Sequence, residues 1–207
     1  LNQPQENELQ YLQLLSKTFP TIADASTEII NLQAILNLPK GTEHFLADIH
    51  GAYESFQHVL KNASGNIKRK VNELFGNQIR DTELRDLCTL IYYPEQKLEM
   101  VKLVEEDIND WYHITIHYLV AVCRLVSSKY TRSKVRKALP VDFSYIIQEL
   151  LHEITDDIDK AGYVTAVIDS MIESDSADDF IIAIAHVIQR LAIDRLHILG
   201  DIYDRGP

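Results

Sequence analysis

An Asp-x-His-Gly motif at residues 48–51 is the first pattern whose residue types could do chemistry. It follows a short apolar run at residues 44–47, which is typical of a buried strand. Residues i and i+2 of an extended chain point to the same side, so Asp48 and His50 would bring a carboxylate oxygen and an imidazole nitrogen together. Such a pair suits a divalent ion such as Mn²⁺, Fe²⁺ or Zn²⁺. The alternative is a helix N-cap aspartate beside a histidine that binds no metal.

A second pattern, Gly-Asp-x-x-Asp-Arg-Gly, occupies residues 200–206 and also follows a short apolar run. Asp201 could bridge two cations with its two carboxylate oxygens, since ions about 3.5–4 Å apart need a shared anion. We expect Asp204 to lie too far along the loop to share that cation easily, and to orient a histidine instead. Arg205 offers a planar guanidinium that matches phosphate oxygens. The alternative is a polar loop with an internal Asp–Arg pair.

The elements that must position these motifs are two short strands, at residues 44–47 and 195–199. Sites in α/β folds are built at the carboxyl ends of strands. We therefore expect the two strands to be adjacent and parallel, with Asp48 and Asp201 in one site. Their carboxylates should lie within about 10 Å of each other, because two bridged metals span only about 4 Å. His44 and His197 are expected to be packing or edge residues of the strands.

Most of the remaining chain has the apolar periodicity of helices. With 7 glycines and 6 prolines, few residues interrupt long helices. The predicted helices, in chain order, lie at residues 8–18, from Thr21 or Ser26 to 36, and at 53–60, 64–75, 81–91, 94–129, 143–154, 157–172 and 177–192. Ser64 and Asp81 are the expected caps of two of these helices. The pattern predicts a predominantly α-helical chain with two short parallel strands that carry the motifs.

Composition excludes several classes of protein. The chain is 46% hydrophobic and 25% charged, which is the balance of a soluble globular protein. A net charge of −11 disfavours nucleic-acid binding, and it repels anionic substrates unless a metal or placed arginines reverse the local field. Cys88 and Cys123 lack metal-ligand spacing and are expected to be buried, reduced thiols, as in a cytoplasmic protein. No window of 18 apolar residues indicates a membrane span.

One strongly basic stretch, residues 129–137, contains five lysines and arginines and no acid. It could bind an anionic effector or an acidic surface of the same protein. The alternative is a solvated helix end, where cations interact favourably with the C-terminal dipole.

The two motifs together resemble the calcineurin-like metallophosphoesterases, whose pattern opens with Asp-x-His and continues with Gly-Asp-x-x-Asp-Arg-Gly. Residues 25–51, 90–94 and 196–207 are similar to the class III fructose-1,6-bisphosphatases of bacteria. The resemblance implies an α/β metallophosphoesterase sandwich overall. A long helical stretch between the motifs is a trait of that family, and we divide the chain into residues 1–63, a helical insertion at 64–193, and residues 194–207.

The resemblance also implies roles for the site residues. Asp48 and His50 would bind the first metal, and Asp201 would bridge two Mn²⁺ ions. Asp204 would support a catalytic histidine, and Arg205 would hold the transferred phosphoryl group. The implied reaction is hydrolysis of the 1-phosphate of fructose 1,6-bisphosphate, a small-molecule sugar bisphosphate, in cytoplasmic gluconeogenesis.

The family pattern continues past residue 207 with an Asn-His motif and two further ligand histidines. Because the chain also begins with Leu, we expect an N-terminal fragment that carries half of the active site and is inactive alone. Two other functions stay open. A phosphoprotein or dinucleotide metallophosphatase is disfavoured because its motifs lie only a few tens of residues apart. A helical interaction module with a degenerate metal site is the second alternative, and a homo-oligomer is one assembly that the sequence permits.

Overall fold

The computed structural model describes residues 6–152 and 158–204 of the 207-residue chain. The chain forms two compact units, Leu1–Pro39 and Lys40–Pro207. The boundary between residues 39 and 40 falls inside the first predicted part, residues 1–63. The division into residues 1–63, 64–193 and 194–207 stays a prediction.

The N-terminal unit is a pair of helices, α1 (Glu6–Thr18) and α2 (Ile22–Ile35). Of the two predicted caps for α2, the structure selects Thr21. Its hydroxyl accepts a hydrogen bond from the Asp24 N–H at 3.1 Å, and the Asp24 carboxylate accepts one from the Thr21 N–H at 3.2 Å. This reciprocal pair is a capping box, which satisfies amide groups that have no partner within the helix. None of the residues of α2 is buried.

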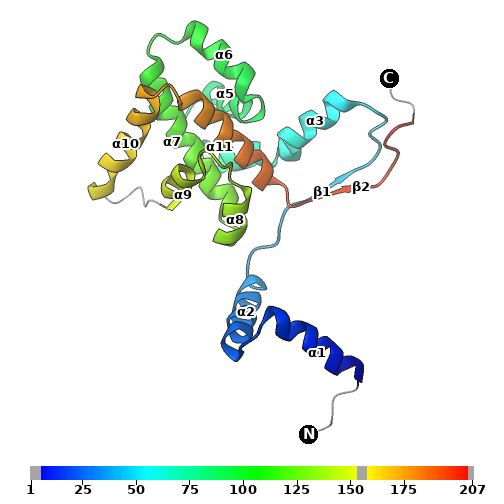
Figure 1. Cartoon of the computed structure of the whole chain (residues 1–207). Coiled ribbons are helices and arrows are strands. Elements are labelled where there is room, and N and C mark those ends of the chain that lie inside the picture. The colour runs from blue at the N-terminus through cyan, green and yellow to red at the C-terminus, as the bar shows by residue number, and fades with distance from the viewer. Residues whose placement is uncertain (1–5, 153–157, 205–207) are drawn as a thin grey trace. The chain divides into compact units, whose positions relative to one another are not determined.

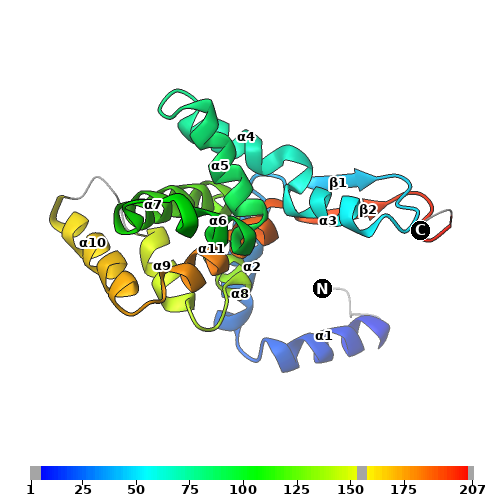
Figure 2. The ribbon, with the colours of Figure 1, turned by 90° about the horizontal axis from the view of Figure 1, so that it is seen from above.

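The second unit is a helical body with a short sheet extending from it (Figures 1 and 2). Its helices are α3 (Tyr53–Lys61), the 3₁₀ turn η1 (Ala63–Gly65), α4 (Asn66–Phe75), α5 (Asp81–Tyr92), α6 (Pro94–Val104), α7 (Ile108–Ser127), α8 (Arg132–Ala138), α9 (Ser144–His152), α10 (Ile158–Glu173) and α11 (Ala177–Ala192). The core lies where α7 and α11 pack together, and its fully buried side chains include Ile116, Leu119, Phe180 and Ile184. Burial of each such side chain stabilises the fold by about 1.5–3 kcal/mol.

Three local predictions were wrong. The stretch 94–129 is not one helix, because Glu105 is extended and the Asp107 side chain accepts a hydrogen bond from the Asp110 N–H at 3.0 Å, which starts α7. Ser64 does not cap α4, which begins after Gly65, a residue in the left-handed conformation. Asp81 is the first residue of α5 and not its cap.

The sheet consists of β1 (Glu43–Leu46) and β2 (Arg195–Ile198), which are parallel and in register from Glu43 opposite Arg195 to Leu46 opposite Ile198. The prediction of two adjacent parallel strands is confirmed. His44 is buried, and its Nδ1 lies 2.8 Å from the Ser64 hydroxyl. Ser64 thus forms a hydrogen bond with a strand residue and does not cap a helix.

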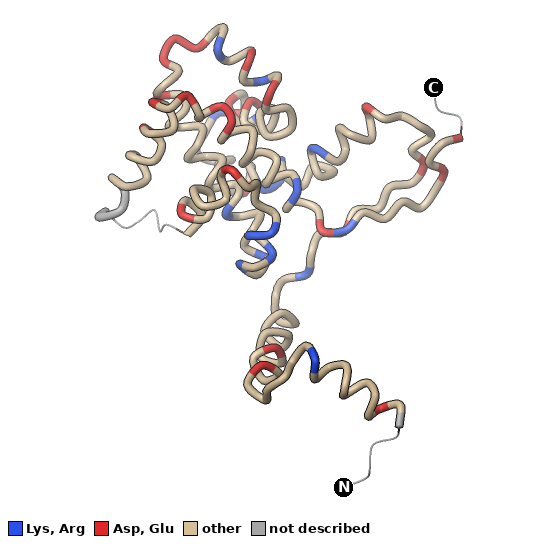
Figure 3. The backbone as a smooth tube through the Cα atoms, in the orientation of Figure 1, with Lys and Arg blue, Asp and Glu red and all other residues tan. Residues whose placement is uncertain are grey.

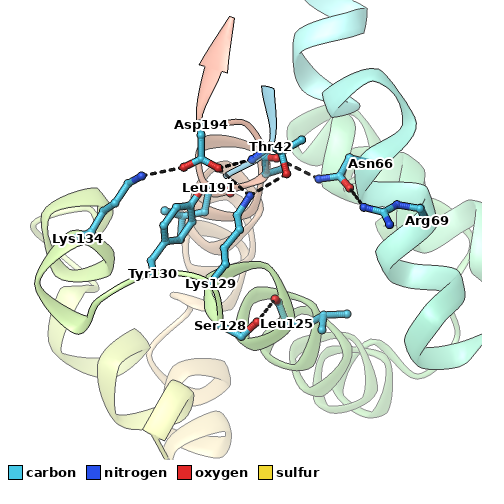
Figure 4. A network of polar contacts seen from close by, with 11 residues as sticks. Thr42, Asn66, Arg69, Leu125, Ser128, Lys129, Tyr130, Lys134, Leu191 and Asp194 are labelled. Atoms are coloured by element: carbon cyan, nitrogen blue, oxygen red, sulfur yellow. Dashed lines mark hydrogen bonds and ion pairs between the residues drawn. The ribbon is translucent and has the colours of Figure 1, made fainter. Parts of the chain in front are cut away.

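An ion-pair cluster fixes the start of both strands to the helical body (Figure 4). Asp194 directly precedes β2, and its carboxylate accepts a hydrogen bond from the Thr42 N–H at 2.7 Å. Lys129 and Lys134 pair with the same carboxylate at 2.9 and 2.8 Å. We call these four residues the Asp194 clamp. Burial alone would raise the pKa of Asp194, but hydrogen bonds from Lys134, Tyr130 and Lys129 outweigh it and hold that pKa well below its usual range.

Cys88 and Cys123 are free and buried, as expected, and burial raises the pKa of the Cys123 thiol to about 12. Among the described residues, no helix has the length and apolarity needed to cross a membrane.

Candidate metal centre

The two motif loops run side by side past the ends of the strands. The hydrogen bonding between the two strands continues by one bond beyond them, in which the Leu199 N–H donates to the Leu46 carbonyl at 2.9 Å. The Asp201 N–H then donates to Asp48 Oδ1 at 3.1 Å, and the Ile49 N–H donates to the Asp201 carbonyl at 2.8 Å. Residues 153 positions apart in the sequence are thereby held in one constellation.

His50 is turned toward the second loop by its backbone. It has a φ of 50° and Gly51 has a φ of 70°, so two successive residues occupy the left-handed region. His50 Nδ1 lies 2.6 Å from the carbonyl oxygen of Asp204 and 3.0 Å from its carboxylate oxygen. These hydrogen bonds, the backbone one above all, and the charges of Asp204 and Asp48 raise the pKa of His50 above its ordinary value, while desolvation opposes them.

Three side chains have potential ligand atoms within 4.8 Å of one another, namely His50, Asp201 and Asp204. The position of Asp204 differs from the expectation that it lies too far along the loop to share a cation. The loop turns back after Asp201, so that Asp204 reaches the imidazole of His50. Asp48 stands outside this group of three and contacts Asp201 through the backbone amide. Arg205 lies outside the described residues.

Gly200 is required by the close approach of the loops. A Cβ atom built at this position would overlap the Asp48 carboxylate and would lie 3.2 Å from the carbonyl carbon of Ala47. A side chain at residue 200 would therefore displace the Asp48 carboxylate, which accepts a hydrogen bond from the Asp201 N–H, and would press on the backbone of Ala47.

The cluster is open to solvent, with 31% of the His50 side chain and 52% of the Asp204 side chain exposed. Figure 3 shows acidic residues gathered where the two strand-following loops meet. Two carboxylates this close repel each other in the absence of a cation. An imidazole nitrogen with carboxylate oxygens is a donor set that suits Mn²⁺, Fe²⁺ or Zn²⁺. The residues present therefore fit a divalent metal ion.

Comparisons with known proteins point to one family. A family model described as Firmicute fructose-1,6-bisphosphatase matches residues 10–207. A class 3 fructose-1,6-bisphosphatase of Bacteroides thetaiotaomicron is 68% identical over 200 residues, which are 97% of this chain and 30% of the relative. Proteins with the same description are 66% identical over 201 residues in Clostridium beijerinckii (97% of this chain, 31% of the relative) and 62% identical over 202 residues in Clostridium botulinum (98% and 30%). The chain thus spans about 30% of the length of these relatives, and no solved structure matches it significantly.

Proposed function

Because the chain belongs to the Firmicute fructose-1,6-bisphosphatase family, we propose that the full-length protein hydrolyses the 1-phosphate of fructose 1,6-bisphosphate and that this chain supplies part of its metal site. The observation that carries the proposal is the convergence of His50, Asp201 and Asp204 at the ends of two parallel strands. Sugar-bisphosphate hydrolysis is also the activity in the names of relatives that match 97% of the chain.

In this proposal, His50, Asp201 and Asp204 hold a divalent cation, and Mn²⁺ is the ion that we assign. A bound cation supplies a Lewis acid for phosphoryl oxygens and lowers the pKa of water. Asp48 has a second role, because its Oδ1 fixes the backbone of Asp201. We assign its other carboxylate oxygen to the same metal centre.

Asp204 orients the imidazole of His50 through contacts of 2.6 and 3.0 Å to Nδ1. A carboxylate or carbonyl on one ring nitrogen fixes the orientation of a histidine ligand. For Arg205 we propose contact with the phosphoryl group, since a guanidinium offers paired donors that match phosphate oxygens. The proposal includes a place in gluconeogenesis and a cytoplasmic location, which the free cysteines favour.

The test is release of inorganic phosphate from fructose 1,6-bisphosphate by the full-length protein, first treated with a chelator and then supplied with Mn²⁺, Mg²⁺ or Zn²⁺. Activity should return best with Mn²⁺. Asp201→Asn should lower kcat by about 100-fold or more, because a group that stabilises charge in the transition state is lost. The matched control is Asp86→Asn in α5, an exposed aspartate that pairs with Lys97, and it should leave kcat unchanged.

Two results would overturn the proposal. One is retention of more than about a tenth of the activity by Asp201→Asn, given the expected loss. The other is a wild-type protein that hydrolyses a phosphoprotein or a dinucleotide but not the sugar bisphosphate. That outcome would favour the alternative class of metallophosphatase.

A further inference from the structure

A cavity of about 260 Å³ lies between the end of α7, the helix α8 and the end of α9, remote in sequence from the motif loops. Its lining includes Arg124, Arg132, Arg136 and His152, together with the hydroxyl groups of two serines, and among the residues that the structure describes no acidic side chain lines it. This is notable in a chain with 31 acidic residues and a net charge of −11. Figure 3 shows lysine and arginine gathered along α8. We propose that this cavity binds a small molecule that carries a phosphate monoester.

Arg132 and Arg136 are the side chains available to such a ligand. They are four residues apart on α8, so they share one face of the helix, and like charges in that arrangement repel each other. Within the described part of the chain neither guanidinium has an ion-pair or hydrogen-bond partner. An anion between them converts the repulsion into two attractive contacts, each of which can use the paired donors of a guanidinium.

Arg124 forms a fixed wall of the cavity. Its Nε donates to the carbonyl of Leu151 at 3.1 Å, and its Nη2 donates to the carbonyl of Leu150. These carbonyls belong to the last turn of α9. The carbonyl groups of a last turn have no N–H partner within the helix, and they carry partial negative charge. Arg124 therefore interacts with the partial negative charge at the end of α9. This interaction does not explain why Arg132 and Arg136 also line the cavity.

The volume of the cavity limits the size of the ligand, and its arginines indicate the charge of the ligand. Its volume is slightly below the range of about 300–1,000 Å³ that is typical of sites for larger ligands, so a compound of few atoms fits. A phosphate monoester carries about −1.5 to −2 charges at pH 7 and three acceptor oxygens, which match two guanidinium groups better than a single carboxylate does. Gln148 donates from Nε2 to the Ser144 carbonyl at 3.0 Å, which leaves its side-chain oxygen to accept a hydrogen bond from the organic part of the ligand.

One residue of the cavity lining, Tyr130, also contacts the Asp194 clamp, because the Nζ atoms of Lys129 and Lys134 lie 4.9 and 4.0 Å from the centroid of its ring. Tyr130 lines the cavity, and it lies between Lys129 and Lys134 in the turn that leads from α7 into α8 (Figure 4). The Tyr130 hydroxyl donates to the Leu191 carbonyl at 2.9 Å, near the end of α11. A ligand in the cavity would thus hold both the turn that carries Lys129 and the helix α8 that carries Lys134, and it would stabilise the folded state by mass action.

The test is calorimetric titration of the full-length protein with glycerol 3-phosphate, in the presence of a chelator so that metal at the motif loops does not hold phosphate. We expect measurable binding by the wild type and at least tenfold weaker binding by Arg132→Gln/Arg136→Gln, since hydrogen bonds to charged groups are lost. The matched control, Lys68→Gln/Lys137→Gln, removes the same charge from side chains that do not line the cavity and should keep the wild-type affinity. Arg132→Lys/Arg136→Lys keeps the charge without the planar donors, and should bind with intermediate affinity.

Equal affinity of the wild type and the Arg132→Gln/Arg136→Gln variant would overturn the proposal, as would an equal loss in the control variant. If the glutamine variant fails to fold by circular dichroism, the lysine variant decides, and wild-type affinity in that variant overturns the paired-donor contact. A second calorimetric titration uses inorganic phosphate in place of glycerol 3-phosphate. We expect it to bind several-fold more weakly than the ester, and equal affinity would overturn the assignment of an ester as the ligand. The proposal does not depend on the proposed hydrolysis.

Discussion

His50 illustrates how backbone strain serves the candidate site. A non-glycine residue in the left-handed region costs roughly 1–2 kcal/mol. His50 holds a φ of 50° because its N–H donates to the Asp201 carbonyl at 3.2 Å and the next residue, Gly51, donates to Ile202 at 2.8 Å. The strained turn directs the imidazole toward Asp204, where a regular strand would have carried it past the second loop.

Gly200→Ala should displace the Asp48 carboxylate, because the added methyl group would overlap it. We expect the full-length variant to lose most of its Mn²⁺ affinity, by about tenfold or more, as is typical when groups that orient ligands are displaced. Calorimetric titration with Mn²⁺ measures this loss.

The control for this substitution is Gly162→Ala in α10, where an added Cβ meets nothing within 4 Å. Alanine is favoured over glycine in a helix by about 0.8–1 kcal/mol, so this variant should be as stable as the wild type or more so. Unchanged metal affinity in Gly200→Ala would contradict this prediction and show that the site tolerates displacement of the Asp48 carboxylate.

At the scale of elements, the packing of α7 determines stability. Leu119 is fully buried in α7, and Leu103 in α6 is 85% exposed. Leu119→Ala should lower the free energy of unfolding by about 2–5 kcal/mol, through lost transfer energy and the cavity left behind. Leu103→Ala should change it by less than about 0.5 kcal/mol. Urea unfolding followed by circular dichroism measures both, and equal effects would contradict the assigned core.

Asp194→Asn should weaken the connection between the sheet and the helical body. Only 10% of the Asp194 side chain is exposed, and breaking a buried pair costs about 3–5 kcal/mol. Because the folded-state pKa of Asp194 is depressed, its contribution is fully present above the ordinary aspartate pKa of about 3.9 and is lost as the pH falls further. The difference in unfolding free energy between wild type and variant should therefore be largest near pH 7 and narrow below about pH 4.

Urea unfolding between pH 2.5 and pH 7 tests this dependence, with Asp86→Asn as a variant that removes an exposed paired carboxylate. That control should show little change at any pH, because surface ion pairs contribute little. A constant difference between wild type and Asp194→Asn across the range would rule out the carboxylate charge as the source of stability.

The sequence was sufficient to predict the strands and the convergence of the motifs, since apolar runs that end in Asp-x-His and Gly-Asp indicate strand ends. It was insufficient where a side chain had a choice of partners. Asp107 starts a new helix inside a continuous apolar pattern, and Ser64 bonds to His44 instead of to a helix end. The position of Asp204 depends on the turn of its loop and on the left-handed backbone of His50, which residue spacing does not reveal.

At the scale of the whole molecule, the residues that the structure describes leave part of the sheet exposed to solvent. Parallel sheets are almost always buried on both faces. Phe45 in β1 is 62% exposed, and Leu199, just past β2, is 72% exposed. The relatives are about three times as long as this chain, so their further length is available to cover strands of this kind and to add ligands at the strand ends.

The 207-residue chain alone should therefore bind Mn²⁺ weakly and hydrolyse no phosphate ester. Its described residues bring His50, Asp201 and Asp204 together and place Asp48 beside them, whereas an octahedral Mn²⁺ site takes about six donors and a two-metal site takes more. Water can occupy open positions, but it adds neither the charge nor the rigidity of protein ligands. A phosphatase assay with Mn²⁺ beside a calorimetric titration tests this on the purified chain, with Asp201→Asn as the background. Turnover above that background, or binding of two ions at submicromolar concentration, would show that these residues complete the site by themselves.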